Sequence, residues 1–193
     1  MSCNFNNQQI VKDASINVRH EIDVPLDALL ERSLPEMELN NFKRINDTII
    51  FTSPASFLYF PMGKFKKETE ILNNYPELKL SNQQYVSDAG LFQLYKYRYK
   101  QSFIKMIKND ESGLLDIVSA KIVDKDITLK NGVAVGIQKT NFIKLFFKPG
   151  VNLENYNVVK IESLILGITH IYSFNEGRLN EIIIDSDYQV DKK

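Results

Sequence analysis

Few residues in this chain are of the types that carry nucleophilic or acid–base chemistry. The sequence holds one cysteine, Cys3, and two histidines, His20 and His170. A serine or cysteine nucleophile would need one of these histidines as its base, and no H-x-x-H or H-E-x-x-H spacing is present. His170 lies in the alternating stretch GITHIYSF, which indicates a structural position on a strand. We therefore expect no catalytic residue and no cofactor.

Two pairs of carboxylates have a spacing that could hold a divalent cation. Asp124 and Asp126 flank Lys125 in VDKDI, and Asp185 and Asp187 lie near the C-terminal end in IDSDY. Residues two apart on a strand point to the same side, but neither pair lies in the glycine-containing loop of a calcium site. A single cysteine also excludes a zinc site built from thiolates. We expect solvated strand ends here, and no metal.

The stretch LYKYRYK is the most distinctive candidate for a binding surface. On a strand, its tyrosines would line one face and its cations the other. The tyrosines are Tyr95, Tyr97 and Tyr99, and the cations are Lys96, Arg98 and Lys100. The row of tyrosines is either half-buried beneath a helix or exposed as an adaptable contact surface. Nucleic-acid binding would place aromatic residues and cations on one face, so this separation argues against it.

Composition favours a globular protein without a strong field for polyanions. The chain has 193 residues, with 24 Lys and Arg against 24 Asp and Glu. A chain of this length can bury a core without a disulfide or a metal. Balanced charge gives no overall attraction to nucleic acid or to an anionic membrane, and no apolar run reaches the roughly 18 residues of a membrane span.

The elements expected to position these residues follow one plan twice. NDTIIFTSPASFLYF leads into PMGKFKKETEILNNYP, and VDKDITL leads into KNGVAVGIQKTNFIKLFFKP. In each case a strand-like run is followed by a glycine, a short amphipathic helix and a proline. Long alternating strands come next, and the polar turns NDESG and NEG predict antiparallel hairpins.

The predicted fold class is α+β, with two approximate helix-plus-antiparallel-sheet repeats and the helices packed on one face of the sheet. The expected divisions are a flexible tether at residues 1–9, an N-terminal segment with a short helix at 10–45, repeat one at 46–123 and repeat two at 124–190.

Part of the second half resembles a known family. The residues NGVAVGIQKTNFIKLFFKP and HIYSFNEGRLNEIII are similar to small bacterial lipoprotein domains of the SmpA/OmlA type and to the tandem domains of β-lactamase-inhibitor proteins. The matching positions are Gly136, Phe142, Pro149, Phe174, Gly177 and Leu179. Such domains bind other proteins and carry no catalytic residues, so the resemblance implies a binding module.

The N-terminal stretch MSCNFNNQQ resembles the end of a bacterial lipoprotein signal peptide, in which the cysteine becomes lipidated. The charged and apolar regions that precede such a cysteine would then lie upstream of Met1. The alternative is an N-terminus that happens to contain one cysteine.

Together these features predict a lipid-anchored cell-envelope protein that binds a protein partner. Cys3 is the expected lipid attachment, and the anchor is the expected membrane contact. The expected partner-binding residues are Tyr95, Tyr97 and Tyr99 with the hairpin residues Asn175, Glu176 and Gly177. Two alternatives stay open: a cytoplasmic immunity or inhibitor protein, and a hydrolase or small-ligand carrier with a pocket between the helices and the sheet.

Overall fold

The computed structural model describes residues 42–53, 56–87, 90–147, 151–163 and 167–188. Across these ranges the chain forms nine β-strands, two α-helices and one short 3-10 helix. In chain order they are β1 (Phe42–Ile45), β2 (Thr48–Ser53), η1 (Ser56–Leu58), α2 (Glu68–Asn74), β3 (Lys79–Ser87), β4 (Gly90–Tyr99), β5 (Ser102–Lys108), β6 (Leu115–Ile122), α3 (Lys139–Phe146), β7 (Val158–Ser163), β8 (Thr169–Asn175) and β9 (Arg178–Asp185). The expected tether at residues 1–9 and most of the expected segment 10–45 lie outside the described residues.

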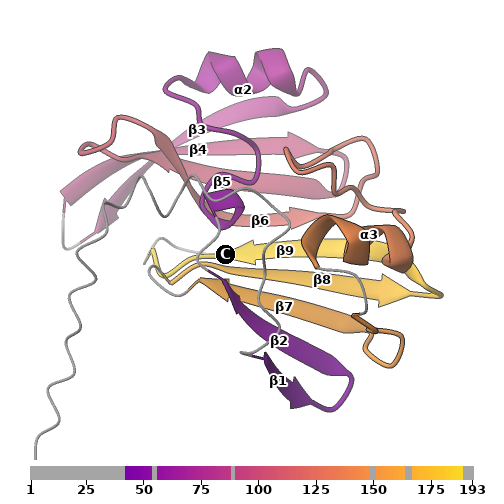
Figure 1. Cartoon of the computed structure of the whole chain (residues 1–193). Helices are drawn as coiled ribbons and strands as arrows, with labels where there is room; N and C mark the ends of the chain where they lie inside the picture. Colours follow the sequence, from indigo (N-terminus) through magenta and orange to yellow (C-terminus); the bar gives the residue numbers. More distant parts are fainter. Residues whose placement is uncertain (1–41, 54–55, 88–89, 148–150, 164–166, 189–193) are drawn as a thin grey trace, which may run out of the picture.

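These strands form one mixed sheet in the order β1-β2-β7-β8-β9-β6-β5-β4-β3 (Figure 1). β3 to β6 make an antiparallel meander, and β7 to β9 make a second one. β9 joins the two meanders because it pairs antiparallel with β6. The hairpin β1–β2 is added at the far side, where β2 runs parallel to β7.

Two tight turns set the register of the long strands. NDESG connects β5 to β6, and Gly113 there has a φ of 67°. NEG connects β8 to β9, with φ of 49° at Glu176 and 71° at Gly177. Positive φ at both central residues is typical of a type I′ turn, whose twist matches that of a hairpin. Both hairpins expected from the sequence are therefore confirmed.

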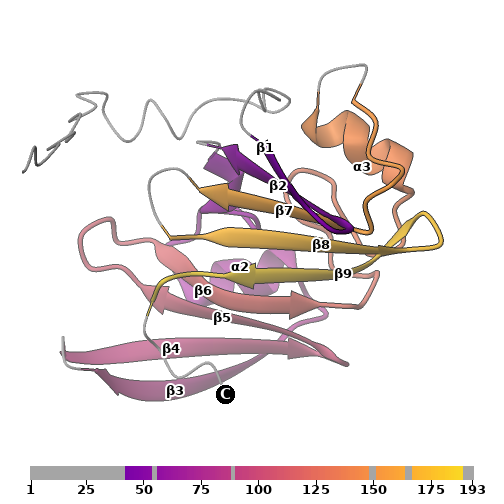
Figure 2. The same cartoon turned by 90° about the horizontal axis from the view of Figure 1, so that it is seen from below.

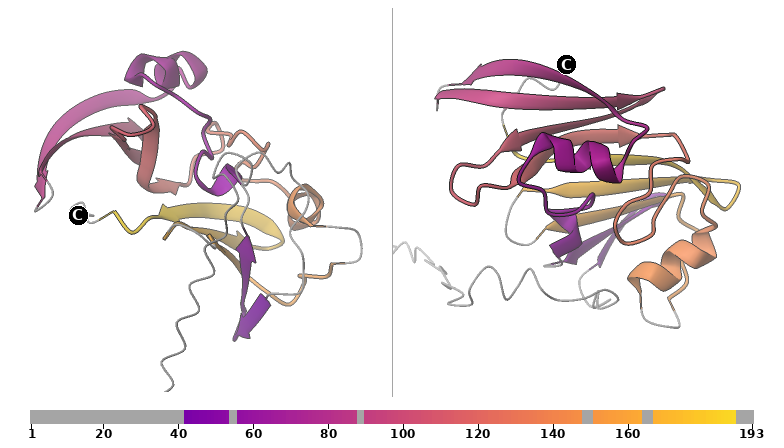
Figure 3. Two further views of the ribbon diagram at one scale, coloured as in Figure 1. Left: turned by 60° about the vertical axis from the view of Figure 1, so that its left-hand side comes forward. Right: turned by 90° about the horizontal axis from the view of Figure 1, so that it is seen from above.

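The hydrophobic core lies on the face of the sheet that carries both helices, which we call the inner face (Figure 3). Ile71 of α2 and Phe142 and Phe146 of α3 are buried in it. The ring of Phe142 lies 4.8 Å from that of Tyr172 and 5.1 Å from that of Phe174, between centroids. These separations suit favourable aromatic pairs, so α3 is anchored to the sheet by aromatic packing.

Figure 2 views the opposite face of the sheet, which we call the outer face. This face carries a much smaller apolar cluster. It consists of Leu94, Ile107 and Val118, with Tyr188 packed against them. The chain after β9 returns over this cluster, where the N–H and the hydroxyl of Ser186 donate to the carbonyl of Val118 at 3.1 and 2.7 Å. Residues 186–188 thus fasten the chain to the outer face.

The predicted fold class, α+β with two helix-plus-antiparallel-sheet repeats, is wrong. The structure is mostly β, and its described α-helices have only seven and eight residues. α2 is followed by four strands but α3 by three, and the parallel β2–β7 pair joins strands from both expected repeats. The physical reason is that the apolar faces of the helices span about two turns, too little for an independent helical layer, whereas the alternating segments extend over seven to ten residues.

The boundary expected between residues 123 and 124 lies in the loop after β6, and strands from both sides of it form one continuous sheet. Residues from both sides of that position, from Ile49 to Ile184, contribute to one core cluster.

Candidate binding surface

The three tyrosines of LYKYRYK lie on the inner face of β4. Tyr97 has no exposed surface, and Tyr95 and Tyr99 are half-buried against the core. Burial, and then the nearby charge of Glu68 on α2, raises the pKa of Tyr97. Its hydroxyl is buried without a hydrogen-bond partner. Tyr95 and Tyr97 therefore lie near Glu68 of α2, and Tyr97 presents no area to a partner in this conformation.

The carboxylates of VDKDI accept hydrogen bonds from neighbouring groups. The Oδ2 atom of Asp124 accepts hydrogen bonds from the N–H groups of Gln101 and Ser102 and from the hydroxyl of Ser102, at 3.2, 3.1 and 2.6 Å. Asp126 accepts from the Tyr99 hydroxyl and from Lys100, each at 2.9 Å. These bonds, led by the one from Lys100, lower the pKa of Asp126. The pair thus ties the β4–β5 turn to the loop after β6.

The two carboxylates of the second pair, in IDSDY, have different surroundings. Asp185 ends β9 and pairs with Thr169 and Ser119 in the ladder. Asp187 packs against Gly167, where an added Cβ would lie 2.7 Å from the Asp187 side chain. Within the described ranges, no group of three or more His, Cys, Asp or Glu side chains is arranged to hold a metal ion.

The NEG turn is exposed at its tip but fixed at its base. Asn175, Glu176 and Gly177 are all exposed. The carbonyl of Gly177 accepts a hydrogen bond from the N–H of Lys139 at 2.8 Å, at the start of α3. The guanidinium of Arg178 donates to the carbonyl of Gly136 at 3.0 Å. The turn therefore offers a small, well-ordered surface next to α3.

His170 is completely buried on the inner face. Its Nε2 lies 3.0 Å from the carbonyl oxygen of Leu58, and its Nδ1 lies 2.9 Å from the hydroxyl of Tyr172. A carbonyl can only accept, so Nε2–H donates to Leu58 and Nδ1 accepts from Tyr172. Burial lowers the pKa of His170 to about 4. The Nε2 bond thus holds η1 to the sheet, and the Nδ1 bond joins His170 to its neighbour on β8.

A depression of about 420 Å³ lies elsewhere, between the loop after η1, the end of α2 and the loop after β6. Its walls include Met62, Phe65 and Tyr75, and its charged residues are Lys64, Lys130, Glu77 and Asp126. His170 does not line it. The mixture of two cations and two carboxylates defines no single class of ligand.

A group of cations and one aromatic ring meets on the outer face of β3, β4 and β5. Directly opposed residues of antiparallel strands point to the same face, so the register places Lys79 beside Arg98 and Arg98 beside Phe103. In the next row it places Lys96 beside Lys105. Lys96 and Arg98 share a face because they are two residues apart. We call Lys79, Lys96, Arg98, Phe103 and Lys105 the basic patch.

Phe103 lies at the centre of the basic patch. The ammonium groups of Lys96 and Lys105 lie 6.0 and 5.9 Å from the centre of its ring, at the outer limit of cation–π attraction. Lys105 is only 3% exposed, Lys96 and Phe103 are half-buried, and Arg98 is exposed. The patch therefore runs from a buried lysine to cations that are open to solvent.

Like charges meet at Lys96 and Arg98 within the basic patch. Partial burial, and then the charges of Arg98 and Lys105, lower the pKa of Lys96. In the part of the chain that the structure describes, no ion pair involves Lys96 or Arg98. By contrast, Lys121, which is opposed to Phe103, pairs with Glu181 at 2.7 Å. An anionic group placed between Lys96 and Arg98 would relieve this repulsion.

Sequence reasoning missed the basic patch because its ring and its buried lysine come from the next strand. The signal is the two-residue connection Lys100-Gln101, which aligns Tyr99 with Ser102 and hence Arg98 with Phe103. Lys100 has a φ of 47°, which lies in the left-handed region that Asn or Gly usually occupies in such a turn. Because neither Asn nor Gly is present at this position, the sequence does not predict the turn or the strand register that the turn sets.

Cys3 and His20 lie outside the described residues, so the expected lipid attachment is not tested by the structure. None of the described helices is long and apolar enough to cross a bilayer.

Comparison of the chain with models of protein families, with curated proteins and with solved structures gave no match. The resemblance to SmpA/OmlA-type and β-lactamase-inhibitor domains therefore stays a prediction.

Proposed function

We propose that the protein is a non-catalytic binding module that holds an acidic segment of a partner protein on the basic patch. The observation that carries the proposal is the arrangement of Lys96 and Arg98, without acidic partners in the described chain, around the half-buried ring of Phe103. Aromatic and arginine side chains are the residues that contribute most at protein interfaces.

A protein segment fits this surface better than a nucleic acid does. The chain is neutral overall, so it lacks the excess positive charge that polyanion binding requires. The outer face beyond the patch carries balanced pairs, Lys121 with Glu181 and Lys160 with Glu162 at 2.7 and 2.6 Å. A long phosphate backbone would run onto these carboxylates, whereas a short acidic segment would not.

Charge reversal within the patch tests the proposal. The probe is a short labelled peptide in which glutamate alternates with threonine, and its binding is followed by fluorescence anisotropy. We expect Lys96→Glu with Arg98→Glu to weaken binding at least tenfold, because attraction becomes repulsion. The matched control, Lys43→Glu with Lys125→Glu, changes the net charge equally at exposed positions outside the patch, and should bind within about threefold of the wild type.

Two results would overturn the proposal. Equal loss of binding in both double variants would mean that net charge alone attracts the peptide. A single-stranded oligonucleotide that binds more tightly than the peptide, with the same dependence on Lys96 and Arg98, would identify the patch as a nucleic-acid surface.

The cell envelope and attachment through Cys3 remain part of the proposal. Labelling of the protein with palmitate, expressed from its gene with the upstream DNA, should be lost in Cys3→Ala. An unlabelled protein in the cytosol would instead favour the immunity or inhibitor alternative.

A further inference from the structure

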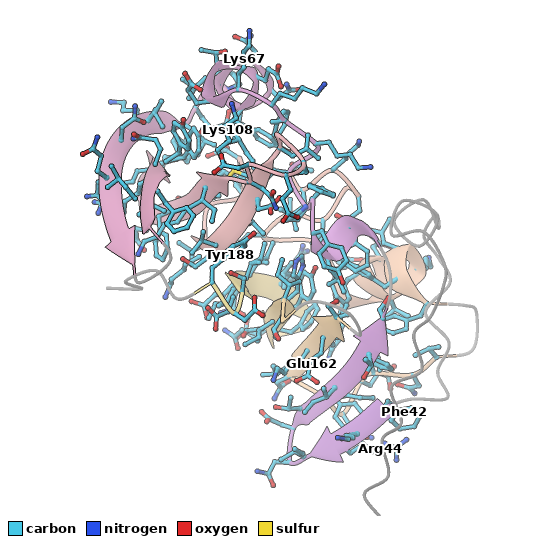
Figure 4. All side chains as sticks on the ribbon, turned by 90° about the vertical axis from the view of Figure 1, so that its left-hand side faces the viewer. Phe42, Arg44, Lys67, Lys108, Glu162 and Tyr188 are labelled. Carbon is cyan, nitrogen blue, oxygen red and sulfur yellow. The ribbon has the colours of Figure 1, made fainter. Side chains whose placement is uncertain are left out.

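The two edges of the sheet differ in how they are protected. β1 is four residues long and includes Lys43 and Arg44, and short, charged strands are the usual protection of an edge against added strands. β3 at the other edge has nine residues, and after Lys79 it contains no charge and no proline. Figure 4 shows Phe42 and Arg44 at the β1 end of the molecule, and Lys67 and Lys108 at the end where β3 lies.

β3 is regular along its whole length. It pairs with β4 in nine consecutive register positions without a bulge. The four consecutive residues from Ser81 to Gln84 are all exposed. Among the described strands, β4 is its sole neighbour in the sheet. Alternate N–H and C=O groups of β3 therefore point away from β4, in the arrangement that receives an added strand.

The basic patch begins at this edge. A strand added beside β3 would lie about 4.8 Å from it and would turn alternate side chains to the outer face. There they would meet Lys79 directly, and the long side chains of Lys96 and Arg98 from one strand further in. On the inner side they would meet Leu80 and the polar residues Asn82 and Gln84. A carboxylate opposite Lys79 would thus lie beside a cation of β3, and one opposite Ser81 would face Lys96 across β3.

We infer that an extended segment of the partner, with acidic residues at alternate positions, binds as a tenth strand on β3. Main-chain hydrogen bonds to β3 supply affinity, and the basic patch selects the acidic pattern. This inference rests on the proposed function and specifies the geometry of the same interaction.

Backbone methylation of the peptide distinguishes strand addition from simple charge attraction. Two versions of the glutamate–threonine peptide carry N-methyl groups, one on the glutamate nitrogens and the other on the threonine nitrogens. Successive N–H groups of a strand point to opposite edges, so only one version loses its bonds to β3. We expect that version to bind at least tenfold more weakly, and the other to bind within about threefold of the parent peptide.

A pair of proline variants makes the same test on the protein. Asn82→Pro and Gln83→Pro remove consecutive N–H groups, one directed at β4 and the other away from it. The variant that keeps the wild-type unfolding midpoint has lost only an outward N–H, and we expect it to bind the peptide at least tenfold more weakly.

The outcomes separate the two proposals. If both methylated peptides bind equally, and binding still depends on Lys96 and Arg98, strand addition is wrong and the proposed function stands. If the parent peptide does not bind at all, both fail. A dimer in analytical ultracentrifugation that the tolerated proline variant abolishes would assign the β3 edge to a second copy of this chain instead.

Discussion

His170 and Tyr172 form a small polar network in the part of the core where η1 meets the sheet. Burial keeps the imidazole neutral, and in that form it donates to the Leu58 carbonyl and accepts from the Tyr172 hydroxyl. Protonation would place two hydrogens on a ring that faces one acceptor and one hydroxyl in a site without water access. The stability of this part of the core therefore depends on pH.

The stability of the protein should fall as the pH is lowered through the range set by His170. Its pKa is about 4 when folded, below the unfolded value of roughly 6.5. The unfolded chain thus takes up a proton first, and the contribution is complete above about pH 6.5 and lost towards pH 4. Between pH 7 and pH 4.5 we expect a loss of about 2 kcal/mol.

Urea unfolding of the wild type and of His170→Gln at both pH values measures this contribution. The difference in unfolding free energy between the two pH values should be smaller in the variant by about 2 kcal/mol. An identical pH dependence in both proteins would show that His170 does not titrate as described.

At the residue scale, the sequence predicted the alternation of LYKYRYK correctly but did not decide which face is buried. Tyr97 and Arg98 have opposite environments because the helix-bearing face takes the tyrosines. Alternation alone defines the two faces of a strand but does not decide which of them is buried. The choice depends on where α2 packs, which is a tertiary property.

At the scale of single elements, the segment after β9 shows how a glycine permits a close contact. Residues 186–188 cross the outer face, and the hydroxyl of Tyr188 donates to Asp116 at 2.8 Å. At Gly167 an added Cβ would lie 2.7 Å from both Cβ and Cγ of Asp187. No normal packing allows this distance, so the segment would have to move.

We expect Gly167→Ala to destabilise the protein by about 1–3 kcal/mol, as overpacking commonly does. Hydrogen exchange should also become faster at the N–H of Ser186, which is bonded to Val118. The double variant Gly167→Ala with Asp187→Gly removes the clashing atoms and should recover most of the loss. If the double variant is no more stable than Gly167→Ala, another contact is responsible.

Element prediction succeeded where turn chemistry was visible in the sequence. NDESG and NEG both end in glycine at a positive φ, and both hairpins are as expected. The turn at Lys100 and Gln101 has no such residue, although it sets the register of the basic patch. The helices were expected from real apolar stripes, but those stripes are too short to form a separate layer.

At the scale of the whole molecule, the core and the sheet are continuous across the expected division. β6 lies before position 123, and its partner β9 lies after it. β2 and β7 are divided in the same way. Separating the halves would expose two strand edges and divide one core.

We therefore expect fragments 46–123 and 124–190 to be unfolded when each is expressed alone, whereas the full chain unfolds in one cooperative transition. Circular dichroism and urea titration of the three proteins measure this. Cooperative unfolding of either isolated fragment would show that this fragment folds without the other.

The sheet order could not have been read from the chain, because its two joining contacts are distant in sequence. Local patterns identify strands and hairpins, and they account for both meanders. They contain no information on whether β9 pairs with β6, or on which strand receives β2. The mixed sheet follows from those two pairings, and the fold class was missed with them.

The parallel pairing of β2 with β7 has a consequence for synthesis. Thr48 is registered with Val158, so more than half of the chain must leave the ribosome after β2 before its partner exists. A two-stranded hairpin is marginal on its own in water. We therefore expect Ile49 and Phe51 of the nascent β1–β2 hairpin to stay exposed to solvent during synthesis. Docking of the hairpin onto β7 is expected to complete folding once the C-terminal meander has formed.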